Sequence, residues 1–208
     1  MNKKVSQIEK TLKDKSRQSV DDLLRYALFE MKSPIEDYDM ALDILVENCG
    51  ESDDIRPLIL GAYLSSTWRS FEVNGFLERL RAHLPSADSQ NKAIIYYLHA
   101  YDIYIRCKNR CPREYAEYLK KSVACSARFV YNFVRLAEVS DSKEALQLME
   151  QAVANVEKVW TEEQLKAAPE CELSYERFVD EFILGVDISS LEYNQLVAKR
   201  NSLGQRKG

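Results

Sequence analysis

Histidine and cysteine are the residues of this 208-residue chain with the most recognisable chemistry, and there are few of them. His99 lies in the tyrosine-rich stretch "AIIYYLHAYDIYIRCKNRC" (93–111), which also holds Cys107 and Cys111. Two thiols four residues apart suit one face of a helix, but Pro112 interrupts a helix at that point. Structural zinc takes four ligands, and His99 points to another side of the helical wheel. We therefore expect no metal and no cofactor here.

The chain has few residues and no recognised motif for covalent catalysis. A cysteine nucleophile needs a nearby base and an electropositive setting, and His83 and His99 are the only histidines. The sequence contains no glycine-rich phosphate loop, no His-Glu-x-x-His and no Gly-x-Ser-x-Gly. Acid–base work by paired carboxylates stays open, because spatial pairing of acids is not visible in a sequence. The motifs favour a protein that is not an enzyme.

Composition predicts a helical protein. Hydrophobic residues make up 46% and charged residues 30%, which is a globular balance, and six glycines with five prolines are few for a chain of many β-turns. The formal charge of −4 makes nucleic acid an unlikely partner, although residues 1–18 form a basic lead-in. No apolar run has the length of a membrane span or signal peptide, and five irregularly spaced cysteines suggest reduced thiols. We expect a cytoplasmic protein that does not contact membranes.

Helix start signals recur along the chain. Ser33-Pro34-Ile35-Glu36 is typical of a capped helix beginning at residue 34, and Asp141-x-x-Glu144 predicts another start. Short breaks separate the helical segments, so neighbouring helices should pair as antiparallel hairpins. The predicted organisation is a basic lead-in (1–18), a helical repeat array (19–168), capping helices (169–200) that cover the last repeat, and a disordered tail (201–208).

The hairpins show an approximate repeat. Equivalent positions early in each second helix, at steps of 35, 39 and 30 residues, are Ala41, Phe76, Tyr115 and Ala145. These steps lie near the roughly 34 residues of a helix-turn-helix repeat. The stretch "YLKKSVACSARFVYNFVRLAEVSDSKEALQLMEQAV" (118–153), with its Leu136-Ala137 pair, resembles a tetratricopeptide repeat, and residues 24–45 and the Leu60-Gly61 pair are similar to parts of such units. The resemblance covers about residues 20–160 and implies a short right-handed α-solenoid of stacked hairpins.

The resemblance also implies where a partner would bind. The first helix of each hairpin lines the concave side of such a solenoid, and each of three such helices places an arginine on the face expected to meet solvent. The predicted partner-binding residues are Arg69, His99, Asp102, Arg106, Tyr131, Arg135 and Glu138. Arginine donors suit carboxylates, so the row predicts an acidic protein or peptide partner, unless each arginine pairs with its own acidic neighbour.

The tyrosines of 93–111 are expected to form the opposite, buried face. Tyr97, Tyr101 and Tyr104 cluster on the apolar side of the helical wheel, where they would pack against a partner helix. A tyrosine-lined pocket is the alternative.

Together these features favour a non-enzymatic adaptor or scaffold that binds a segment of another protein in its concave groove. Two alternatives stay open at this point. One is an inhibitor or immunity-type protein that caps an enzyme. The other is a ligand-binding or enzymatic helical protein with a site between helices.

Overall fold

Helix is the only regular secondary structure in the described part of the chain. The structure, a computed structural model, describes residues 19–31, 38–48, 54–69, 75–107, 113–126, 128–159 and 173–205, and these contain helices and turns but no strand. Within these ranges, no helix combines the length and the apolar character needed to cross a bilayer. The predicted all-α class is confirmed.

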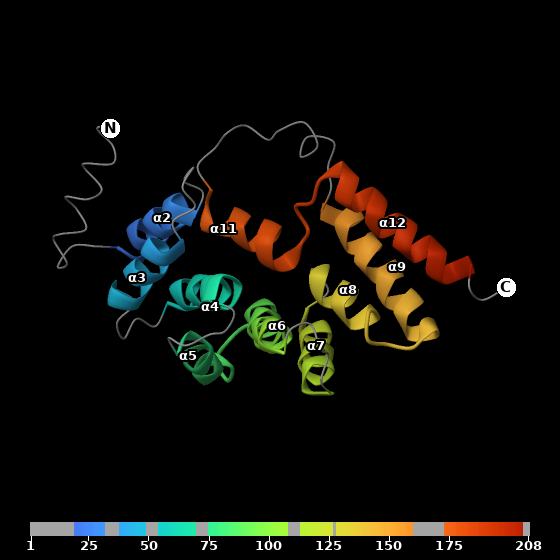
Figure 1. The fold of residues 1–208 in the computed structure, drawn as a ribbon, viewed down its shortest axis with the longest axis horizontal. Helices are drawn as coiled ribbons and strands as arrows, with labels where there is room; N and C mark the ends of the chain where they lie inside the picture. Colours follow the sequence, from blue (N-terminus) through green and yellow to red (C-terminus); the bar gives the residue numbers. More distant parts are fainter. Residues whose placement is uncertain are drawn as a thin grey trace.

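In the described residues between 20 and 159, eight helices follow one another, each packed on its neighbours in the chain. They are α2 (Val20–Met31), α3 (Tyr38–Asn48), α4 (Arg56–Arg69), α5 (Phe76–His83), α6 (Ser89–Arg106), α7 (Arg113–Cys125), α8 (Tyr131–Ala137) and α9 (Ser142–Val159). Figure 1 shows that they trace an arc from α2 and α3 at one end to α8 and α9 at the other.

Side-chain caps fix several of the helix starts. Asp88 Oδ1 accepts the backbone N–H of Asn91 at 2.7 Å at the start of α6, and Asp141 Oδ1 accepts the N–H of Glu144 at 3.0 Å at the start of α9. These bonds satisfy amides that have no partner within the helix. The predicted helix start at Asp141 is confirmed, whereas the predicted start at residues 33–36 lies outside the described residues.

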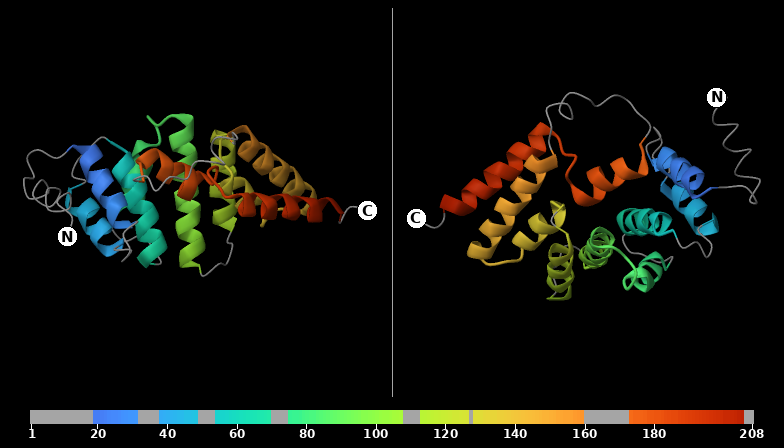
Figure 2. Two further views of the ribbon diagram at one scale, coloured as in Figure 1. Left: turned by 90° about the horizontal axis from the view of Figure 1, so that it is seen from above. Right: turned by 180° about the vertical axis from the view of Figure 1, so that it is seen from behind.

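The C-terminal part turns back across the arc. Helix α11 (Tyr175–Phe178) continues directly into a π-helical turn, η1 (Val179–Leu184), and α12 (Ser190–Gln205) follows. Figures 1 and 2 show α11 and η1 on the inner side of the arc, between α2 and α8. We call residues 173–188 the return segment. It contacts α2 at one end and α8 at the other.

Two predictions for this region need correction. Helix α12 does pack along α9, but α11 returns to α2 instead of covering the last hairpin, because its apolar residues are buried there and against α4. The tail predicted from residue 201 is helical through Gln205. Leu203 packs against the core, and the Ser202 hydroxyl donates to the Lys199 carbonyl at 2.8 Å.

Candidate functional site

Four tyrosines form one group, which we call the tyrosine face: Tyr63 of α4 with Tyr97, Tyr101 and Tyr104 of α6. The Tyr63 and Tyr101 rings stack at 5.8 Å and 8°, and Tyr97 stacks on Tyr101 at 6.2 Å and 18°. Tyr63 also meets Phe178 of the return segment edge to face, at 5.4 Å. The tyrosines therefore face the same side as the return segment.

The tyrosine face is partly covered. Tyr97 is 5% exposed and packs on Phe129, whereas Tyr101 and Tyr104 keep part of their surface in solvent. Burial raises the pKa of Tyr97, so its hydroxyl stays protonated. The hydroxyls of Tyr101 and the exposed Thr67 lie 3.3 Å apart. The tyrosine face is thus buried at Tyr97 and partly exposed at Tyr101 and Tyr104.

Arg135 of α8 lies beside the open part of the tyrosine face. Its guanidinium carbon sits 5.0 Å from the centre of the Tyr104 ring, a cation–π contact. The side chain is 35% exposed, and Nη1 pairs with Glu138 at 3.4 Å. Glu138 is held more closely by Lys199 of α12, at 2.8 Å. Of the sequence-predicted residues, Arg135 and Glu138 are therefore brought together with the tyrosines.

Asp102 and Arg106 do not join this group, which corrects the predicted row. Asp102 of α6 faces α4 and is only 3% exposed. Its carboxylate accepts a 3.4 Å hydrogen bond from the Ser66 hydroxyl of α4 and pairs with Arg106 Nε at 2.6 Å. At 100° per residue, Arg106 points about 160° away from Tyr104, which Arg135 covers. The two arginines lie on opposite sides of α6. The side chain of Arg69 lies outside the described residues.

Tyr131 packs against Gly185 of the return segment. Its ring lies against Gly185, where an added Cβ would come within 2.6 Å of the ring carbons. Burial is the main cause that raises the pKa of Tyr131. The residue predicted to contact a partner therefore helps to hold the return segment against α8.

His99 also lies away from the tyrosine face. Its ring stacks on Tyr118 of α7 at 5.1 Å and 12°, and no described residue accepts or donates a hydrogen bond at its buried Nε2. Burial, and next the positive charge of Arg81, lower the pKa of His99 from its usual 6.5. The charged groups around it are Glu78, Arg81, Asp102 and Arg106.

This environment predicts a pH dependence of stability. Because the pKa of His99 is lower in the folded state, the unfolded chain binds a proton more readily, and the free energy of unfolding should fall as the pH drops below about 6.5. Denaturant unfolding at several pH values should show a smaller fall for His99→Gln than for the parent chain. His83→Gln serves as the control and should keep the fall that depends on His99. An unchanged pH dependence in His99→Gln would contradict the assignment.

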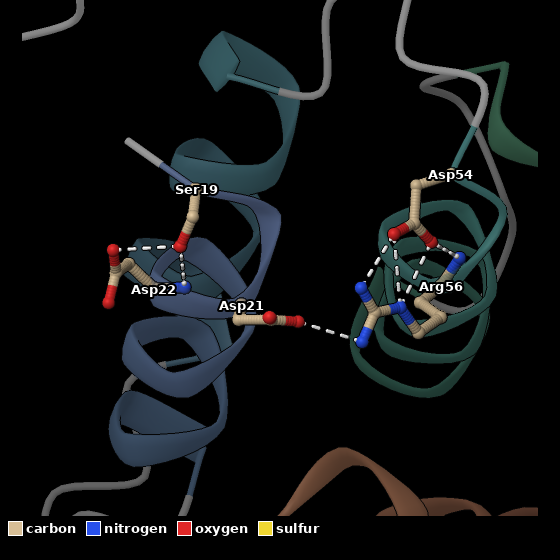
Figure 3. A network of polar contacts seen from close by, with 5 residues as sticks. All are labelled: Ser19, Asp21, Asp22, Asp54 and Arg56. Carbon is tan, nitrogen blue, oxygen red and sulfur yellow. Dashed lines mark hydrogen bonds and ion pairs between the residues drawn. The ribbon is translucent and has the colours of Figure 1, made fainter. Parts of the chain in front are cut away.

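A pocket of about 460 Å³ opens at the other end of the return segment, between α2, the start of α4 and the start of α11. Figure 3 shows Asp21 reaching from α2 toward Arg56 of α4, with Asp54 on the other side of the guanidinium. The Asp21–Arg56 distance is 2.8 Å. No sequence motif marks this pocket, because its three walls come from distant parts of the chain.

No protein-family model, curated protein or solved structure matches this chain. Metal chemistry gains no support from the described residues, where no three His, Cys, Asp or Glu side chains converge. Cys107 is a half-buried free thiol, and Cys111 lies outside the described ranges.

Proposed function

We propose that this protein is a tetratricopeptide-like interaction module that binds a segment of another protein on the inner side of its arc. The observation that carries the proposal is the partly exposed end of the tyrosine face, Tyr101 and Tyr104, with Arg135 against the Tyr104 ring. Tyrosine and arginine are among the residue types most enriched at the centres of protein interfaces. The contacts between helices that are consecutive in the chain support the proposed stack of hairpins.

The return segment supports this choice of surface. Phe178 and Phe182, from its helical turn, both meet the Tyr63 ring, at 5.4 and 6.2 Å. The inner side of the arc thus accommodates a helical segment with aromatic anchors, and the open end of the tyrosine face offers the same chemistry to a second chain.

The charges favour an acidic segment. Arg135 has a long 3.4 Å pair with Glu138, which Lys199 holds at 2.8 Å. A carboxylate from a partner would gain a shorter bond to Arg135 while Glu138 keeps Lys199. The proposed location is the cytosol, where the free thiols of Cys107 and Cys125 would stay reduced.

Photo-crosslinking tests the surface. A photoreactive phenylalanine analogue at Tyr104 should capture a partner in the source cell, whereas the same analogue at Tyr118, which stacks on His99 away from the tyrosine face, should not. Capture from both positions alike would contradict the proposal. Loss of activity of a captured enzyme on binding would identify an inhibitor instead of an adaptor.

The role of Arg135 is tested on the purified partner. Arg135→Gln should weaken binding by about tenfold, with a smaller salt dependence, because one charge-assisted bond is lost. Arg113→Gln is the matched control, since its side chain is 93% exposed at the start of α7. Equal affinities of the two variants, measured by titration calorimetry, would exclude Arg135 from the interface.

A further inference from the structure

The pocket between α2, α4 and α11 has an apolar floor. Leu24 and Leu28 of α2 and Leu173 before α11 are all buried in the core and line the pocket, and the Tyr175 ring adds an aromatic wall. A volume of about 460 Å³ lies in the range of small-molecule sites. An aliphatic group of a few carbons would therefore replace water on an apolar surface there.

Arg56 is oriented toward this pocket by its neighbours. Its Nε and Nη2 donate to Asp54 Oδ2 at 3.0 and 2.7 Å, and its guanidinium carbon lies 5.9 Å from the centre of the Tyr175 ring. The hydrogen bonds from Arg56 also lower the pKa of Asp54, which keeps that carboxylate charged. One edge of the guanidinium is thus fixed, as in a bidentate arginine–carboxylate pair.

The other edge of Arg56 meets a carboxylate that is easily replaced. Nη1 pairs with Asp21 Oδ1 at 2.8 Å across the space between α2 and α4 (Figure 3). The Asp21 side chain is 69% exposed, so it can turn into solvent at little cost. Asp21 therefore occupies the position that the carboxylate of a ligand would take.

The charges around the pocket select the type of ligand. Its lining carries two arginines, Arg25 and Arg56, and two acids, Asp21 and Glu176. A simple anion would meet the two acids, and a simple cation would meet the two arginines. A molecule with a positive charge, a negative charge and an aliphatic group complements the acids, the arginines and the leucines of the lining.

We propose that this pocket binds a free aliphatic α-amino acid. Its carboxylate takes the place of Asp21 on Nη1 of Arg56, its ammonium group lies between the released Asp21 and Glu176, and its side chain rests on the leucine floor. A residue within a peptide has no free ammonium and carboxylate on the same carbon, so the site distinguishes the free amino acid from a peptide segment. This site is separate from the tyrosine face and does not depend on the proposed interaction function.

Titration calorimetry with L-leucine tests the proposal. The matched probes are 4-methylpentanoate, which lacks the ammonium group, and 3-methylbutan-1-amine, which lacks the carboxylate. L-Leucine should bind about tenfold more tightly than either probe, because each lacks one charge-assisted contact. An N-acetyl-leucine amide, which represents a leucine within a peptide, should bind as weakly as the probes or more weakly.

Variants then separate the two ends of the ligand. Arg56→Gln should weaken L-leucine binding by about tenfold. Glu176→Gln changes an exposed residue and leaves the fold intact. It should weaken the binding of L-leucine but not the binding of 4-methylpentanoate. Arg135→Gln and Arg113→Gln should bind L-leucine like the parent chain. The proposal is overturned if the parent chain does not bind L-leucine at millimolar concentration, if 4-methylpentanoate binds as tightly, or if Glu176→Gln leaves L-leucine binding unchanged.

Discussion

Replacing Phe178 with alanine should lower the free energy of unfolding by about 3 to 5 kcal/mol, the range for removing a buried phenylalanine. The Phe178 ring is completely buried, although it belongs to a helix of only four residues. It meets Tyr63 edge to face at 5.4 Å and stacks on Phe182 at 5.8 Å. Removing the ring would leave a cavity under the return segment and take away its edge-to-face contact with Tyr63 of α4.

The matched control is Leu191→Ala in α12, where the side chain is 68% exposed and the change should stay within about 0.5 kcal/mol. Urea unfolding followed by circular dichroism gives both values. Tyr63→Leu in a double-mutant cycle with Phe178→Ala should show a coupling of about 1 kcal/mol, since the two rings form one aromatic contact. A Phe178→Ala variant as stable as Leu191→Ala would mean that the return segment is not held against α4.

The return segment also shows where sequence periodicity stops being informative. The spacing of Phe178, Phe182 and Ile183 correctly indicates an apolar stripe, but a stripe does not specify which element it packs against. The preceding hairpins make the last hairpin the nearest partner in the chain. In the structure, the return segment packs on α2, α4 and α8 instead. These helices are distant from it in sequence and lie close to it only because of the arc.

The same limit explains the errors at α6. A helical wheel divides a helix into an apolar and a polar side, and it places Asp102 and His99 on the polar side. Helix α6, however, packs against α4, α5 and α7, so much of its polar side is also covered. Asp102 is tolerated there because Arg106 and the Ser66 hydroxyl satisfy its carboxylate. Local caps, such as Asp141, were predictable because they involve neighbours in the chain.

Arg56 illustrates the part of a site that no local pattern signals. Its immediate sequence, "DDIRPL", indicates a helix start and nothing more. Its orientation depends on Asp54 nearby, on Asp21 from another helix and on Tyr175 from the far end of the chain. Only the packing of α2 and α11 around the start of α4 brings these groups together.

Replacing Gly185 with alanine should lower the free energy of unfolding by about 2 to 5 kcal/mol. Two costs add up at this position. The backbone has φ of 66°, a left-handed conformation that costs a residue with a Cβ about 1 to 2 kcal/mol. The new Cβ would also lie 2.6 Å from the Tyr131 ring, and crowding a packed site costs typically about 1 to 3 kcal/mol.

Gly75→Ala is the control that carries the first cost alone. Gly75 has φ of 73°, but an added Cβ there would have no atom within 4 Å, so its loss should be about 1 to 2 kcal/mol from the backbone alone. The difference between the two variants, measured by urea unfolding, reports the contact between Tyr131 and Gly185. Equal losses would show that the Tyr131 ring moves aside freely and is open to a partner, as the sequence first suggested. A larger loss for Gly185→Ala would place Tyr131 among the residues that hold η1 against α8, which leaves Arg135, Tyr101 and Tyr104 as the part of the inner surface available for binding.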